Sequence, residues 1–139
     1  MILSKYDAQS RLVWQTPGYI CPKGSTPVPN QLVRYGTTLL AMPGGDSCFS
    51  AWNTDTGKMR WAFQAPAEFS FANTPLLLNN VLYAANQFMW ALDFDTGKIL
   101  AVSEENDYTQ GGTGTPQYDV TTNQIILWGL ELQFYKPLK

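Results

Sequence analysis

Few residues in this chain have the types and spacing that catalysis requires. There is no histidine among the 139 residues, which removes the commonest general base and the commonest metal ligand. Glu104, Glu105 and Asp107 form an acidic cluster, but their spacing matches neither a calcium loop nor a glycosidase carboxylate pair. We interpret the cluster as a solvated loop, and we expect no catalytic residue and no metal site.

A glycine-rich segment at 111–114 (G-G-T-G) resembles the start of a phosphate-binding loop. A phosphate loop continues into a Lys-Ser/Thr pair and then a helix, whereas the segment that follows here has the pattern of a strand. The segment is therefore interpreted as a connector between strands. We expect no bound cofactor.

The two cysteines, Cys21 and Cys48, have no spacing that indicates a metal site or a redox motif. Nothing in the sequence marks an oxidising compartment, so two buried free thiols are favoured over a disulfide. The sequence alone leaves the pairing open.

The overall composition favours an all-β protein and excludes two classes of partner. Aromatic residues make up 14% of the chain, and 11 Gly and 9 Pro supply many tight turns. A net charge of −2 gives no electrostatic basis for binding nucleic acid. No apolar run approaches the roughly 20 residues needed to span a bilayer, and no signal peptide is visible, so the compartment is unknown.

One phrase recurs three times along the chain. It reads A-W-N-T-D-T-G-K-M-R-W over Ala51 to Trp61 and A-L-D-F-D-T-G-K-I-L-A over Ala91 to Ala101. A diverged copy, S-K-Y-D-A-Q-S-R-L-V-W, runs from Ser4 to Trp14. The copies begin 47 and 40 residues apart, a spacing typical of repeat architectures.

Each phrase is predicted to be a β-hairpin. Asp55 and Asp95 are expected to bond backbone amides of the turn, and Gly57 and Gly97 to take its positive-φ position. A second pair of apolar segments precedes each hairpin after a Thr-Pro dipeptide. The unit is therefore four antiparallel strands, which is the make-up of a propeller blade.

The fold class predicted is all-β, with β-propeller-like repeats of four-stranded antiparallel blades. We expect two full blades and partial blades at both ends of a single domain covering 1–139. The expected bounds are a partial blade at 1–16, blades at 26–64 and 74–103, and a partial blade at 115–136.

The phrase A-x-D/N-x-D-T-G-K-x-x-W, preceded by Thr-Pro and a strand pair, resembles the repeat of pyrroloquinoline-quinone-type (quinoprotein-like) β-propellers. That group includes quinoprotein dehydrogenases and non-enzymatic scaffold proteins of outer-membrane assembly. The resemblance implies that Trp14 and Trp61 dock against the Gly turn of a neighbouring blade, and Ala101 departs from this pattern. Quinoprotein enzymes have eight blades and an adjacent cysteine pair, which this chain lacks. The resemblance therefore implies a non-enzymatic member without cofactor.

Aromatic residues fall into two groups with different expected roles. Four tryptophans at strand positions are expected to be core: Trp52, Trp61, Trp90 and Trp128. Aromatic side chains in the connections between blades are candidate protein-binding residues: Tyr19, Phe69, Phe71 and Tyr108. Packing into the gaps between blades is an equally supported role for this second group.

Unpaired blade edges favour association with other protein chains, self-association included, because open strand edges must be covered. The leading functional hypothesis is a non-catalytic scaffold or structural subunit of a larger assembly, such as a virion or tail. A carbohydrate-binding propeller is the second hypothesis. A fragment of a quinone-dependent dehydrogenase is the third and least favoured.

Overall fold

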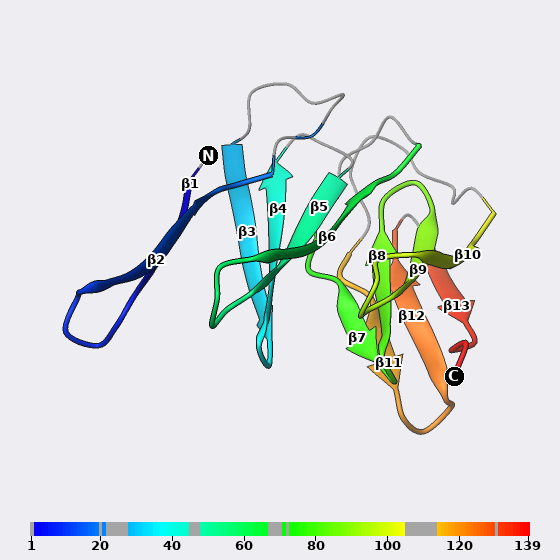
Figure 1. Ribbon diagram of the computed structural model, residues 1–139. Coiled ribbons are helices and arrows are strands. Elements are labelled where there is room, and N and C mark those ends of the chain that lie inside the picture. The colour runs from blue at the N-terminus through cyan, green and yellow to red at the C-terminus, as the bar shows by residue number, and fades with distance from the viewer. Residues whose placement is uncertain are drawn as a thin grey trace. The chain divides into compact units, whose positions relative to one another are not determined.

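The computed structural model describes residues 2–19, 21, 28–44, 48–66, 71, 73–104, 114–129 and 131–139. This part of the chain contains β-strands and turns (Figure 1). The strands are β1 (Ile2–Tyr6), β2 (Leu12–Pro17), β3 (Val28–Tyr35), β4 (Thr38–Gly44), β5 (Cys48–Asn53), β6 (Met59–Gln64), β7 (Leu76–Leu78), β8 (Val81–Ala85), β9 (Met89–Asp93), β10 (Ile99–Val102), β11 (Gln117–Asp119), β12 (Gln124–Trp128) and β13 (Leu132–Tyr135).

The strands form four antiparallel sheets in which each strand pairs with its neighbours in sequence. Two sheets have four strands, β3 to β6 and β7 to β10. The β1–β2 sheet has two strands and the β11–β13 sheet has three. The predicted fold class, two full blades with partial blades at both ends, is confirmed. The chain divides into two compact units, Met1–Pro66 and Ala67–Lys139, and each unit contains one four-stranded sheet.

The repeated turn is organised by the last residue of the third strand. In β5 the Asn53 Oδ1 accepts hydrogen bonds from the amides of Asp55 and Thr56, both at 2.9 Å. In β9 the Asp93 Oδ1 accepts from the Thr96 amide at 2.9 Å and the Thr96 hydroxyl at 2.8 Å. The sequence predicts this role for Asp55 and Asp95. The structure assigns it to Asn53 and Asp93 because a side chain two residues before the turn amides has the reach of an Asx turn.

The glycines of the two turns adopt the backbone conformation that the sequence predicts. Gly57 has φ +68° and Gly97 has φ +70°. Each glycine amide also donates to a strand carbonyl, Gly57 to Asn53 at 2.9 Å and Gly97 to Asp93 at 2.8 Å. The left-handed region costs an L-residue roughly 1–2 kcal/mol, which explains glycine at both positions.

Asp93→Asn is expected to weaken the acid sensitivity of the fold. The hydrogen bond from the Thr96 hydroxyl, together with turn amides, holds the pKa of Asp93 below its ordinary value of 3.8. Since the folded pKa lies below the unfolded one, the carboxylate stabilises the fold above the unfolded pKa. This stabilisation is lost as the pH falls through the folded pKa. Asn53 shows that an amide can make the equivalent turn bonds, so the variant is expected to fold.

The measurement for Asp93→Asn is the melting temperature by circular dichroism, followed from neutral pH down to about pH 2.5. Asp95→Asn removes the same charge from the same turn and is the matched control. A melting temperature that falls with acid as steeply in Asp93→Asn as in the unchanged chain would contradict the assignment.

Each unit has a core that joins its two sheets. In the second unit, β8 is buried along all five residues, and its Val81, Tyr83 and Ala85 share one cluster with Ile125 and Leu127 of β12. In the first unit, Leu3 of β1 packs with Ala41 and Trp52 of the four-stranded sheet. Within each unit, one face of the four-stranded sheet is therefore covered by face-to-face packing with the smaller sheet.

Three of the four strand tryptophans are buried as predicted: Trp52, Trp61 and Trp90. In two of these buried indoles the ring N–H donates a hydrogen bond to a short polar side chain. The Trp52 Nε1 donates to the Ser50 hydroxyl at 2.7 Å, and the Trp90 Nε1 donates to the Asn86 Oδ1 at 2.9 Å. The prediction is wrong for Trp128, whose side chain is exposed.

Cys21 and Cys48 form a disulfide, with their Cα atoms 6.1 Å apart. The preference for free thiols in the sequence analysis is therefore wrong. Both residues are buried, and Cys48 is the first residue of β5. The bridge ties the segment that follows β2 to the four-stranded sheet of the first unit, an approach that only the folded chain reveals.

Candidate functional site

The candidate site is one face of the β11–β13 sheet. Ile125 and Leu127 of β12 point into the core and are fully buried, so Ile126 and Trp128 lie on the opposite face. The β12–β13 register places Phe134 opposite Ile126 and Leu132 opposite Trp128. We call the surface made by Ile126, Trp128, Leu132 and Phe134 the outer face.

The outer face is apolar and open to solvent. Trp128 is 70% exposed, Leu132 60% and Phe134 55%. A hollow of about 370 Å³ lies on it, and its lining includes no charged side chain. The residues that line the hollow are Gly114, Thr115, Gln117, Ile126, Trp128 and Leu132. Contiguous exposed apolar surface of this kind marks a binding surface in soluble proteins.

Each described sheet ends in strands that pair with a neighbour on one side only, and β13 and β1 are two of these edge strands. β13 pairs with β12 alone, and β1 pairs with β2 alone. An edge of this kind can accept another extended segment by main-chain hydrogen bonds. The edge of β13 borders the outer face, so the two features form one surface.

A different contact joins the two sheets of the first unit. The Trp14 indole of β2 lies against the turn that follows β5, where a Cβ built on Gly57 would come within 2.7 Å of the Trp14 Cδ2 atom. The Trp14 Nε1 donates to the Thr54 carbonyl at 2.9 Å. The Lys5 ammonium donates to the same carbonyl at 2.9 Å and lies 3.7 Å from an Asp55 carboxylate oxygen. This cluster positions the sheets and offers no reactive group.

The second repeat tryptophan, Trp61, is buried and contacts Phe49 of the same sheet. Its ring meets Phe49 edge to face, with centroids 5.9 Å apart. Asp95 accepts a hydrogen bond from the Asn80 side-chain amide at 2.9 Å, which links the turn after β9 to the turn after β7.

The loop aromatics proposed as protein-binding residues do not form one surface in the described structure. Tyr19 is half-buried and packs against the cluster of Leu3, Ala41 and Trp52. Phe71 is 2% exposed. Phe69 and Tyr108 lie outside the described residues. The two aromatics that are described thus have the packing role that the sequence left open as an alternative.

Most residues of the acidic cluster and of the glycine-rich segment lie outside the described ranges: Glu105, Asp107 and Gly111 to Thr113. Among the residues that are described, no group of three or more acidic, cysteine or histidine side chains could hold a metal ion. Within the same ranges, no helix is long and apolar enough to cross a membrane.

Sequence reasoning missed the outer face. The signal that could have found it is the run I-I-L-W of β12, which is apolar at both alternating sets of positions. Such a run was attributed wholly to the core, because both faces of an internal blade are buried. In the structure only the face with Ile125 and Leu127 is covered.

Comparison with known proteins gives structural matches only, since no family model and no curated protein matches the sequence. The fold is similar to that of the computationally designed Ika8 protein, with a TM-score of 0.69 and 12% identity over 98% of this chain. It is similar to BamB from Moraxella catarrhalis, with a TM-score of 0.59 and 16% identity over 91% of this chain. It is also similar to the quinohemoprotein alcohol dehydrogenase ADHIIG from Pseudomonas putida HK5, with a TM-score of 0.61 and 15% identity over 91%.

The chain spans 40%, 35% and 25% of the lengths of these three proteins, in the same order. At these identities the likeness concerns the fold alone. Together with the four sheets of consecutive antiparallel strands in the described residues, it shows that this chain has a β-propeller-like fold of four-stranded antiparallel blades.

Proposed function

We propose that this chain is a non-catalytic propeller module that binds other protein chains, as a scaffold or structural subunit of a larger assembly such as a virion or tail. The observation that carries the proposal is the outer face, which is apolar and exposed although it belongs to a strand whose other face is fully buried. The non-catalytic part rests on the sequence, which has no histidine and no adjacent cysteine pair.

The chemistry of the outer face favours another β-sheet as its partner. Trp128 and Phe134 are large, flat side chains on a pleated surface, the kind of surface that packs face to face with a second sheet about 10 Å away. Fully burying one such aliphatic or aromatic side chain contributes roughly 1.5–3 kcal/mol. The free edge of β13 adds main-chain hydrogen bonds, which fix the register of the partner.

A second copy of this chain is the partner that the structure favours. The β1–β2 hairpin also presents exposed apolar side chains, among them Ile2, Tyr6 and Val13, together with the free edge of β1. Two different apolar surfaces on one chain allow head-to-tail contacts, which close into rings or extend into filaments. The low charge of the chain, 14% of residues, provides little repulsion between copies.

Trp128→Ser is expected to weaken self-association at least tenfold, because an exposed tryptophan at the centre of an apolar surface is the side chain most often dominant in binding. Size-exclusion chromatography with light scattering, over a range of concentrations, measures the mass. The unchanged chain is expected to exceed its monomer mass of 15.5 kDa, and Trp128→Ser to shift toward it.

Val120→Ser is the matched control for the association experiment. Val120 is also exposed, but it lies in the turn between β11 and β12, away from the outer face. This variant is expected to associate as the unchanged chain does. A clean monomer at every concentration, or equal effects of the two variants, would overturn self-association through the outer face.

A carbohydrate-binding propeller is the second candidate, and the hollow on the outer face favours it. An exposed indole such as that of Trp128 can stack on a sugar ring, and the Gln117 and Thr115 side chains in the same hollow can bond hydroxyl groups. Screening the unchanged chain and Trp128→Ser side by side on a glycan array separates this candidate from the first. Glycan binding that Trp128→Ser abolishes, in a chain that remains monomeric, would favour the carbohydrate function.

A further inference from the structure

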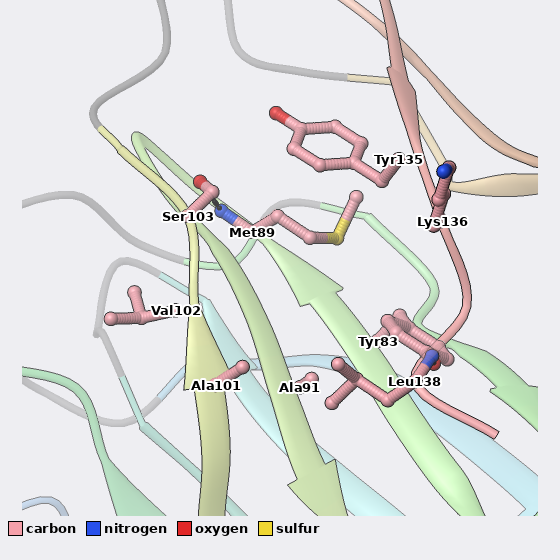
Figure 2. Close-up of a pocket in the computed structure, with 9 residues that line it drawn as sticks. All are labelled: Tyr83, Met89, Ala91, Ala101, Val102, Ser103, Tyr135, Lys136 and Leu138. Atoms are coloured by element: carbon pink, nitrogen blue, oxygen red, sulfur yellow. Dashed lines mark hydrogen bonds between the residues drawn. The ribbon is translucent and has the colours of Figure 1, made fainter.

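The second unit contains a cavity of about 140 Å³ between β8, β9 and β10 on one side and β13 with the segment after it on the other (Figure 2). Its walls are mainly apolar, and the lining residues that carry polar groups are Tyr83, Ser103, Tyr135 and Lys136. The residues that line it are Tyr83, Met89, Ala91, Ala101, Val102, Ser103, Tyr135, Lys136 and Leu138. The cavity lies on the opposite side of the β11–β13 sheet from the outer face, so the two sites are separate.

The cavity lies at Ala101, the position where the other two copies of the repeated phrase end in a tryptophan. In β10, Ala101 pairs with Ala91 of β9. In the preceding repeat, Trp61 pairs with Ala51 in the same register. An alanine therefore stands where the other copies of the phrase have an indole, and Ala101 and Ala91 both line the cavity.

The first unit shows what occupies the corresponding place when the tryptophan is present. There the Trp14 indole lies on the turn after the third strand of the next sheet, and its Nε1 donates to the Thr54 carbonyl. The segment after β13, which begins at Lys136, holds the corresponding place in the last sheet. Lys136 lines the cavity next to the position that an indole would take.

The wall formed by the segment after β13 is held in place by two hydrogen bonds. The Leu138 amide donates to the Tyr83 hydroxyl at 2.8 Å, and the Asn79 side-chain amide donates to the Lys139 carbonyl at 2.8 Å. Figure 2 shows Leu138 beside Tyr83, and the Met89 thioether extending toward the Tyr135 ring. Leu138 thus lines the cavity without filling the space that an indole at position 101 would occupy.

We propose that this cavity binds a planar aromatic ring of the indole class, either a free indole compound or the side chain of a tryptophan from another chain. An apolar cavity of about 150 Å³ is large enough to bind benzene, and this cavity is of similar size. The Met89 sulfur provides a favourable contact for an aromatic ring. The ring N–H is expected to donate to a backbone carbonyl of the segment after β13, as that of Trp14 does to the Thr54 carbonyl in the turn after β5.

Methyl NMR of the chain labelled at its methionine methyl groups tests the proposal with indole as the probe. The sequence has four methionines, so few signals need assignment. Indole is expected to shift the Met89 signal saturably, with a dissociation constant of about 1 mM or lower. Met59 is exposed on another strand and is the internal control. A Met89 signal that does not move, or that moves no more than that of Met59, would overturn the proposal.

Ala101→Trp is the matched variant, because it restores the repeat and fills the cavity from within. It is expected to lose at least tenfold in affinity for indole, whereas Ala62→Trp, in β6 of the first unit and not among the residues that line the cavity, is expected to retain binding. If Ala101→Trp fails to fold, Ala101→Val fills part of the space and is expected to weaken binding in the same direction. Undiminished binding by a folded variant at position 101 would place the ring elsewhere and refute the proposal.

N-acetyl-tryptophanamide distinguishes the two sources of the ring. Binding of indole and of N-acetyl-tryptophanamide alike favours a tryptophan side chain as the natural occupant, and binding of indole alone favours a free compound. Because Trp128 lies on the other side of the sheet, Trp128→Ser is expected to leave indole binding unchanged. The outcome for this cavity is therefore distinguishable from that of the proposed association.

Discussion

Gly57→Ala is expected to lower the free energy of unfolding by about 2–4 kcal/mol, through two separate effects. The backbone of Gly57 has φ +68°, where an L-residue costs roughly 1–2 kcal/mol. The new methyl group would also lie 2.7 Å from the Trp14 Cδ2 atom. The indole must then move, and it loses its fit to the turn and its hydrogen bond to the Thr54 carbonyl. Urea unfolding followed by circular dichroism measures the difference.

Gly36→Ala separates the two effects. Gly36 has φ +56°, close to that of Gly57, but no atom lies within 4 Å of a Cβ built there. Its substitution is expected to cost only the backbone term, about 1–2 kcal/mol. The difference between the two glycine variants is therefore the energy of displacing the indole.

Trp14→Ala completes the cycle with Gly57→Ala. The single variant is expected to cost about 2–4 kcal/mol, because a half-buried indole and its hydrogen bond are lost. In the double variant the clash no longer exists. The double variant is therefore expected to lose less unfolding free energy than the sum of the losses in the two single variants. Fully additive losses in Gly57→Ala and Trp14→Ala, or equal losses in Gly36→Ala and Gly57→Ala, would show that the Trp14 indole does not pack against the turn.

The repeat made the fold predictable from this one sequence. Three copies of a phrase at similar spacing fix the strand pairs, because an apolar run, a turn and a returning run can hardly be arranged otherwise. The glycines at 57 and 97 were placed correctly because their role is local: a positive φ depends on the turn alone.

Features that depend on geometry between side chains were not predictable in the same way. The turns are organised by Asn53 and Asp93, and not by Asp55 and Asp95, because both positions in the phrase carry residues able to bond turn amides. Their spacing does not distinguish the two. Trp128 was assigned to the core from its residue type, yet only the neighbouring sheet decides which face of β12 is covered.

The disulfide is the clearest case of a feature decided by the tertiary fold. Cys21 and Cys48 are 27 residues apart and lie in different parts of the repeat, so no pattern brings them together in the sequence. In the structure the segment after β2 passes next to the start of β5, at a distance that a disulfide spans.

The double variant Cys21→Ala/Cys48→Ala is expected to lower the free energy of unfolding by about 2–5 kcal/mol. A cross-link that closes a loop of 27 residues restricts the unfolded chain, and removing it raises the entropy of that state. Urea unfolding of the oxidised chain and the variant measures the difference. Thiol titration in denaturant is expected to find no free thiol in the unchanged chain, which holds no cysteines besides these two.

The single variants distinguish a cross-link from two independent buried thiols. If the bridge stabilises the fold, Cys21→Ala alone removes it, and the further change Cys48→Ala adds little because the loop is already open. If the sulfurs only pack, each substitution costs a small amount and the two costs add. Additive costs, together with two titratable thiols, would therefore contradict the bridge. A full cost already present in either single variant would establish that the link between β5 and the segment after β2 is covalent.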